Sequence, residues 1–206
     1  MSKRTKYILD VIESIYPNAK CELNYNNPLQ LAIAVALSAQ TTDERVNIVT
    51  KELFIKCPDV YALSSINILK LKDIIKSIGL ANNKAKNLIL MAKKIIKDYN
   101  GVLPNNYNDL VSLAGIGRKS ANVILSECFK MPAIAVDTHV ERVSKRLRIA
   151  KEDDSILKVE YKLMKKINKK RWHKAHHLLI IWGRYKCKAI NPICNGCPLY
   201  KECNYV

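Results

Sequence analysis

The stretch Leu113-Ala-Gly-Ile-Gly-Arg-Lys-Ser-Ala-Asn122 joins two predicted helical segments within residues 105–128. Two glycines around one apolar residue let the backbone turn tightly between antiparallel helices. We expect Ile116 to insert into the core, which leaves the amides of Gly115, Gly117 and the next helical turn facing outward. A helix N-terminus with free N–H groups binds phosphate. The stretch is typical of a helix–hairpin–helix that holds a nucleic-acid backbone without reading bases; a plain turn between helices is the simpler alternative.

Apolar residues recur at helical spacing along the chain, and no segment shows a convincing strand alternation or a strand hairpin turn. The sequence therefore predicts an all-α fold. A break at Met131-Pro132 predicts two helical lobes, one formed by residues 23–132 and one by residues 1–22 together with 133–206. Helix starts are predicted at Pro28, Asp43, Asn67, Asn82 with Asn83, Thr138, and Asp153 with Asp154.

The charge balance is strongly basic, with 35 Lys and Arg residues against 18 acidic residues, a net charge of +17 and a pI near 9.6. Such a balance favours a polyanionic partner, although a lysine-rich codon preference would also produce it. The longest apolar stretch, from Leu29 to Ala39, is too short for a membrane span, and the first residues lack a signal-peptide pattern. We expect a soluble, cytoplasmic protein that associates with the nucleoid if it is bacterial.

Four cysteines lie close together near the C-terminal end, with the spacing C-x6-C-x2-C-x5-C. Prolines, Asn195 and Gly196 between them favour tight turns, so the segment can fold back around one metal centre. Zinc and a [4Fe–4S] cluster both accept four thiolates, and the residue types alone leave that choice open, with disulfides as a third alternative. The predicted ligands are Cys187, Cys194, Cys197 and Cys203, whereas Cys21, Cys57 and Cys128 are scattered and predicted to be ordinary thiols.

Several separate motifs resemble the endonuclease III family of base-excision DNA glycosylases. The matching segments cover nearly the whole chain: 37–43 (Leu-Ser-Ala-Gln-Thr-Thr-Asp), 78–80 (Ile-Gly-Leu), 113–119, 135–139 (Ala-Val-Asp-Thr-His), 183–185 (Gly-Arg-Tyr) and the four-cysteine segment. One position departs from the family pattern, because Ala114 stands where the hairpin usually has proline. The change loosens the turn slightly and leaves the phosphate-binding amides in place.

The resemblance implies a bifunctional glycosylase and AP lyase that removes oxidised pyrimidines. It places the catalytic lysine at Lys119, in the first turn after the hairpin, where the helix dipole favours the neutral, nucleophilic amine. On the residues alone, a lysine there more often pairs with a phosphate. Asp137 matches the aspartate that stabilises positive charge on the sugar, and its residue type also suits an N-cap for the helix from Thr138 to Leu147.

The resemblance also implies a [4Fe–4S] cluster on the four cysteines and DNA crossing a cleft between the two lobes. Gln40 is expected to contact the orphaned base and Leu80 to wedge into the stack. The other predicted DNA contacts are Gly115, Gly117, Arg118, His139, Arg184, Lys186 and Lys188. A monomer acting on damaged double-stranded DNA is expected. The alternatives are a monofunctional mismatch glycosylase, which usually lacks the lysine, and a non-catalytic DNA-binding module.

Overall fold

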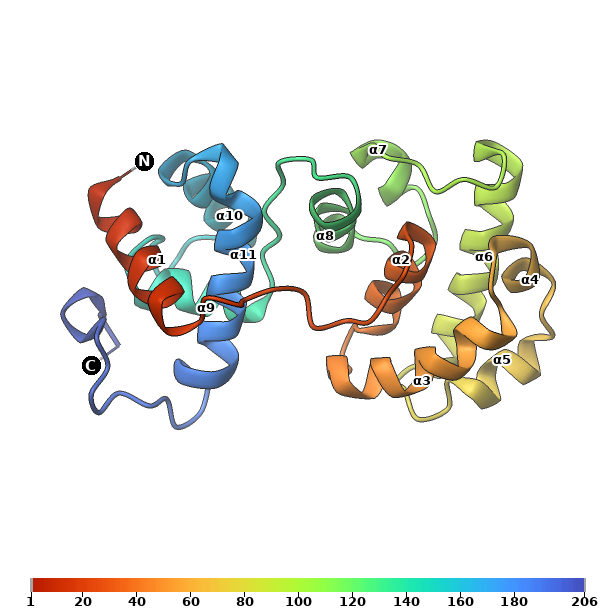
Figure 1. Cartoon of the computed structure of the whole chain (residues 1–206), viewed down its shortest axis with the longest axis horizontal. Helices are drawn as coiled ribbons and strands as arrows, with labels where there is room; N and C mark the ends of the chain where they lie inside the picture. Colours follow the sequence, from red (N-terminus) through yellow and green to blue (C-terminus); the bar gives the residue numbers. More distant parts are fainter. Residues whose placement is uncertain (1, 206) are drawn as a thin grey trace. The chain divides into compact units, whose positions relative to one another are not determined.

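The computed structural model describes residues 2–205, and within this range every regular element is helical, which confirms the all-α prediction. Contacts divide the chain into two compact units (Figure 1). We call Glu22–Lys130 the hairpin unit, and we call the segment up to Cys21 together with the segment from Met131 onward the cysteine unit. Among the described residues, none of the helices combines the length and hydrophobicity that a membrane crossing requires.

The hairpin unit is built around α6, a 19-residue helix with one strongly apolar face. Helices α4, α5 and α2 pack against α6, while α8 packs against α2 and α7 (Figure 1). The elements are α2 (Pro28–Leu37), α3 (Asp43–Lys56), α4 (Val60–Ser65), α5 (Ile68–Ile74), α6 (Ala81–Tyr99), α7 (Tyr107–Val111) and α8 (Arg118–Cys128).

Side-chain caps fix where the helices of the hairpin unit begin. The side chains of Asn27, Asn67 and Asn106 each accept a backbone N–H at the start of α2, α5 and α7, as short polar side chains do at N-caps. Helix α3 begins at Asp43, as predicted, but the expected cap at Asp43 is shifted by one residue, because the Thr42 hydroxyl accepts from Arg45 N at 3.3 Å.

The start of α6 differs more from the prediction. The helix begins at Ala81, so Asn82 and Asn83 lie inside its first turn instead of preceding it. Leu80 occupies the N-cap position with a left-handed backbone, φ 61° and ψ 32°. An asparagine pair suits a cap by local preference, and packing of the preceding loop overrides that preference here.

The cysteine unit contains α1 (Lys3–Ile15), α9 (Thr138–Arg146), α10 (Ile156–Lys166), α11 (Trp172–Ile181) and three short elements. Its core brings α1, α9, α10 and α11 together around Trp182, which is 1% exposed. The short elements are two 3-10 turns, η1 (Lys169–Arg171) and η3 (Tyr200–Glu202), and one π-helical turn, η2 (Trp182–Lys186).

The cap of α10 is Ser155, so the predicted cap at Asp153 and Asp154 is wrong. Asp154 instead accepts from Lys151 N at 2.6 Å and pairs with Lys162 at 2.5 Å. The carboxylate therefore closes the turn before the helix. Ser155, one residue closer to the helix, supplies the oxygen that reaches Lys158 N.

Candidate active site and cysteine site

The hairpin between α7 and α8 has the conformation that its glycines predict. Gly115 adopts φ +84°, a region that L side chains rarely occupy, and Ile116 donates its N–H to Leu113 O at 3.1 Å. Ile116 is 4% exposed, which confirms that its side chain enters the core. Gly117 is the N-cap of α8, and a Cβ built on it would meet no atom within 4 Å. The turn is therefore open on the side of the helix N-terminus, where an anion would bind.

Lys119 is the second residue of α8 and is half-buried beside this turn. Its neighbour Arg118 is exposed and donates from Nη1 to the hydroxyl of Tyr107 at 3.2 Å. The Arg118 guanidinium also lies 5.6 Å from the centre of the Tyr107 ring. Two cationic side chains thus lie at the N-terminus of α8, where the helix dipole already favours negative ligands.

Two other predicted contacts, Gln40 and Leu80, lie on neighbouring loops of the hairpin unit. Both are exposed and both have left-handed backbones, with φ 55° for Gln40 and φ 61° for Leu80. A Cβ built on Gly79 would lie 3.8 Å from Gln40 O, so the two loops approach each other closely. Taken by itself, Leu80 suggests a core or C-cap residue, yet its side chain is 58% exposed. An exposed leucine in a strained backbone suits a side chain that contacts a ligand.

Asp137 is the N-cap of α9, as its residue type predicts. A single oxygen, Oδ1, accepts the backbone N–H groups of His139 at 2.9 Å and Val140 at 2.8 Å. These bonds fix the orientation of the carboxylate. The side chain is half-buried, which keeps a negative charge in a defined place at the start of α9.

His139 and Arg142 lie one turn apart on α9 and contact each other, with 3.1 Å between His139 Nδ1 and Arg142 Nη2. Burial lowers the pKa of His139, and the nearby Asp137 carboxylate opposes that effect. Arg142 also donates to Gly183 O at 2.8 Å and to Cys187 O at 3.2 Å. The helix that carries Asp137 is thus bonded directly to the segment that leads into the cysteines.

The four cysteines belong to a chain of tight turns. Cys187 closes the π-helical turn with a 2.7 Å bond from its N–H to Trp182 O, and Cys197 N donates to Cys194 O at 3.0 Å. Gly196 adopts φ +65°. All four cysteines line one small cavity of about 20 Å³, together with apolar residues that include Leu147, Trp182 and Leu199. The structure thus brings the predicted ligands to the wall of one cavity.

The donors around these sulfurs suit an anionic metal–thiolate centre. Arg146 Nη1 lies 3.4 Å from Cys187 Sγ, and the backbone N–H of Tyr205 lies 3.4 Å from Cys203 Sγ. Hydrogen bonds to sulfur and an apolar surround are features that stabilise and tune iron–sulfur clusters. Four thiolate donors, two N–H groups directed at sulfur and an apolar wall therefore fit a cluster.

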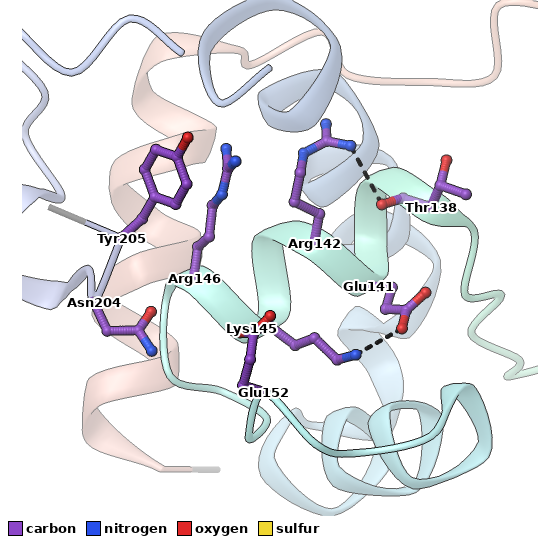
Figure 2. A pocket seen from close by; sticks show the side chains of 8 residues that line it. All are labelled: Thr138, Glu141, Arg142, Lys145, Arg146, Glu152, Asn204 and Tyr205. Carbon is purple, nitrogen blue, oxygen red and sulfur yellow. Dashed lines mark hydrogen bonds and ion pairs between the residues drawn. The ribbon is translucent and has the colours of Figure 1, made fainter. Parts of the chain in front are cut away.

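A larger cavity of about 520 Å³ lies beside this site on the exposed side of α9 (Figure 2). Lys145 pairs there with Glu141 at 2.7 Å, and Arg142 reaches the carbonyl of Thr138. Arg146 lies 3.6 Å from the centre of the Tyr205 ring. The sequence predictions missed the roles of Arg142 and Arg146. Their four-residue spacing on one helical face was the available signal. The lining residues are Thr138, Glu141, Arg142, Lys145, Arg146, Glu152, Asn204 and Tyr205.

Comparisons with known proteins agree with this geometry. Residues 33–169 match the HhH-GPD superfamily base excision DNA repair protein family. Endonuclease III of Bacillus subtilis (strain 168) is 51% identical over 201 residues, which are 98% of this chain and 92% of that protein. Endonuclease III of Escherichia coli (strain K12) is 39% identical over 198 residues, 96% of this chain and 93% of that protein.

Solved structures give the same result. The structure of a trapped endonuclease III–DNA covalent intermediate, an estranged-adenine complex, has a TM-score of 0.95 at 48% identity and covers 99% of this chain and 97% of that one. A thermostable thymine-DNA glycosylase has a TM-score of 0.87 at 21% identity, covers 98% of this chain and 96% of that one, and shares the fold. The chain belongs to the endonuclease III family of base excision repair DNA glycosylases and AP lyases.

Proposed function

We propose that this chain removes oxidised pyrimidines from double-stranded DNA with Lys119 as the nucleophile, and then cuts the strand on the 3′ side of the abasic site. The observation that carries the proposal is the open hairpin turn, which places Lys119 in the first turn of α8, at the N-terminus of that helix. A phosphate held at that turn would bring the neighbouring sugar within reach of the amine. The solved relative captured as a covalent intermediate with DNA supports this chemistry.

The reaction follows from a neutral amine at an electrophilic sugar carbon. Lys119 Nζ forms a bond to C1′ while the bond to the damaged base breaks, and the base leaves with the electron pair. Ring opening gives an imine, which makes the C2′ proton acidic. Loss of that proton then expels the 3′ phosphate by β-elimination, and water hydrolyses the imine to free the lysine.

Asp137 has an electrostatic role in this proposal. Oxocarbenium character develops at the sugar as the base leaves, and a carboxylate held by two N–H groups is preorganised to stabilise it. The proposal therefore requires that Lys119 and Asp137 act on the same nucleotide. It also assigns the damaged nucleotide an extrahelical position during the reaction.

The remaining residues would bind the duplex. Gly115, Gly117 and Arg118 would contact phosphate at the hairpin, Gln40 would contact the orphaned base, and Leu80 would fill the vacated space. His139, Arg184, Lys186 and Lys188 would contribute further DNA contacts from the cysteine unit. We propose that a monomer carries out the reaction, in the cytoplasm and on the nucleoid if the cell is bacterial.

The cysteine site is proposed to hold a [4Fe–4S] cluster through Cys187, Cys194, Cys197 and Cys203. When bound, the cluster would cross-link the segment and could accept or donate an electron. Arg142 and Arg146 would hold the first part of that segment against α9 through its backbone carbonyls. The basic residues Lys186 and Lys188 would thereby be kept in position for phosphate contacts.

Borohydride trapping tests the proposal. The native chain and Lys119→Ala are each incubated with a duplex carrying one thymine glycol, and the matched control is Lys158→Ala, which changes an exposed lysine on α10. We expect a covalent adduct from the native chain and from the control, and none from Lys119→Ala. An adduct from Lys119→Ala would place the nucleophile elsewhere. Tight binding without any adduct from the native chain would favour the monofunctional glycosylase or the binding module.

A further inference from the structure

A buried lysine lies behind the two loops that carry Gln40 and Leu80. Lys84, in the first turn of α6, is 7% exposed. Its Nζ donates three hydrogen bonds, to the carbonyl oxygens of Leu37 at 2.9 Å and Ala39 at 2.6 Å, and to Thr41 Oγ1 at 3.2 Å. No other lysine of the described chain is buried.

These three bonds match the donor capacity of a charged ammonium group, which has three N–H bonds and no acceptor. Leu37 is the last residue of α2, so its carbonyl is one of those that the helix itself leaves without an N–H partner. A cation at a helix C-terminus is also favoured by the helix dipole. Burial lowers the pKa of Lys84, and the three oxygens favour the charged form.

The acceptors lie on both sides of Gln40 in the chain, so the ammonium holds the turn that gives Gln40 its left-handed backbone. Lys84 is also bonded to the loop that carries Leu80, because its backbone N–H donates to Leu80 O at 3.0 Å. One residue therefore contacts both segments through separate atoms. The side chain fixes the Gln40 turn, and the backbone continues directly from Leu80.

We propose that Lys84 is a positioning residue for base extrusion, which holds Gln40 and Leu80 at a fixed separation so that both enter the duplex together. This inference rests on the proposed function. Left-handed backbones at non-glycine residues are unfavourable and persist where surrounding contacts hold them. Without the three donors, the Gln40 turn would relax, and extrusion of the damaged nucleotide would slow while the sugar chemistry stayed intact.

The test uses two substrates that differ only in the cost of extrusion. One is a fully paired duplex with a single thymine glycol, and the other has mismatches on both sides of the same lesion, which remove much of the stacking to be broken. Lys84→Met keeps the length of the side chain and removes the donors. The matched control is Lys93→Met, the same change at an exposed position of α6.

Under single-turnover conditions, we expect Lys84→Met to slow excision from the paired duplex by about tenfold and from the mismatched duplex by less than about threefold. Lys93→Met should change neither rate. In a double-mutant cycle, Lys84→Met should add little to the effect of Gln40→Ala, because both act on the same contact. Equal slowing on both substrates, or additive effects in the cycle, would overturn the inference.

Two further outcomes remain decisive. If Lys84→Met does not fold, Thr41→Val serves in its place, because it removes one of the three acceptors. It should also slow excision more on the paired duplex than on the mismatched duplex, by a smaller factor. Equal rates of excision from the two substrates relative to the native chain overturn the inference. If the native chain excises nothing from either substrate, the proposed function fails, and this inference fails with it. Normal excision by the native chain with identical behaviour of Lys84→Met and Lys93→Met overturns the positioning role alone.

Discussion

Arg146 and Cys187 are joined by a hydrogen bond from Nη1 to Sγ of 3.4 Å, although 41 residues separate them in the chain. The same guanidinium donates to Lys188 O at 2.7 Å and to Ala189 O at 3.3 Å, and it stacks on the ring of Tyr205. Helix α9 therefore holds the first predicted cluster ligand through one buried arginine. A cluster bound here would gain a charged donor at one of its thiolates.

Replacing Arg146 should weaken retention of the cluster. In Arg146→Met, the segment from Cys187 to Ala189 loses three hydrogen bonds. We therefore expect the visible absorption of the bound cluster to decay about tenfold faster in the presence of a chelator, the lower end of typical outer-shell effects. Arg171→Met is the matched control, since Arg171 pairs with Asp10 and Glu13 instead. Equal decay in the native chain and in Arg146→Met would contradict the prediction.

Two changes at Asp137 should separate its local role from its proposed chemical role. Asparagine is as good an N-cap as aspartate, so Asp137→Asn should leave the melting temperature nearly unchanged and lower the excision rate on the order of a hundredfold. Asp137→Ala should lose the cap as well, at a cost of about 1 kcal/mol in the free energy of unfolding. Thermal melting and single-turnover excision check both changes. Full activity of Asp137→Asn would contradict the proposed electrostatic role of this carboxylate.

The two hairpin glycines should respond differently to alanine. Gly115 has φ +84°, and a Cβ there would approach Asn87 Cβ to 3.3 Å, so Gly115→Ala should lower the free energy of unfolding by about 1–2 kcal/mol. At Gly117 the space is open and the φ suits any residue, so the main cost is that alanine is a poorer N-cap than glycine, roughly 0.5–1 kcal/mol. Urea denaturation measures both values. Affinity for duplex DNA should fall in Gly117→Ala as well, because the new methyl group would lie beside the amides that are proposed to bind phosphate. Unchanged affinity would argue against that binding mode.

The lowered pKa of His139 predicts a dependence of stability on pH. Burial is the main cause, so the folded chain holds this proton less tightly than the unfolded chain, whose pKa is near 6.5. As the pH falls below about 6.5, the unfolded state takes up the proton first and stability decreases. His139→Gln should show a smaller loss between about pH 7.5 and about pH 5.5 in urea titrations. An identical loss in the native chain and in the variant would refute the assignment.

The lysines flanking Cys187 should contribute to the salt dependence of DNA binding. Replacing both Lys186 and Lys188 with glutamine should reduce the slope of log affinity against log salt by up to about 1.8, which corresponds to two lost phosphate contacts. Replacing Lys158 and Lys165, both exposed on α10, removes the same charge and should have a smaller effect. Equal changes in slope for the two double variants would show that only net charge matters.

Much of the fold was predictable because its signals are local. The periodic apolar residues predict helices, and the caps at Asn67 and Asp137 depend on an oxygen and an N–H two or three residues away. The hairpin needs a positive φ at Gly115, and glycine adopts a positive φ more easily than any other residue. Where two adjacent polar residues compete, as with Asp154 and Ser155, the local signal could not choose between them, because loop packing decides which oxygen reaches the helix.

The candidate site was predictable in its residue types and in the order of its motifs, since a lysine after a hairpin and four clustered cysteines are visible in the chain itself. The exposure of Leu80 was not predictable from its residue type, because a leucine is usually buried.

Three features follow from the order of the residues alone: the chain is helical, it carries a hairpin suited to phosphate, and its cysteines can share one centre. The burial of Lys84 against the turn of Gln40 and the bond from Arg146 to Cys187 are visible only in the folded chain. In the sequence both look like ordinary surface cations. Their partners are more than 40 residues away, and a contact of that range exists only once the packing of whole helices has brought the two segments together.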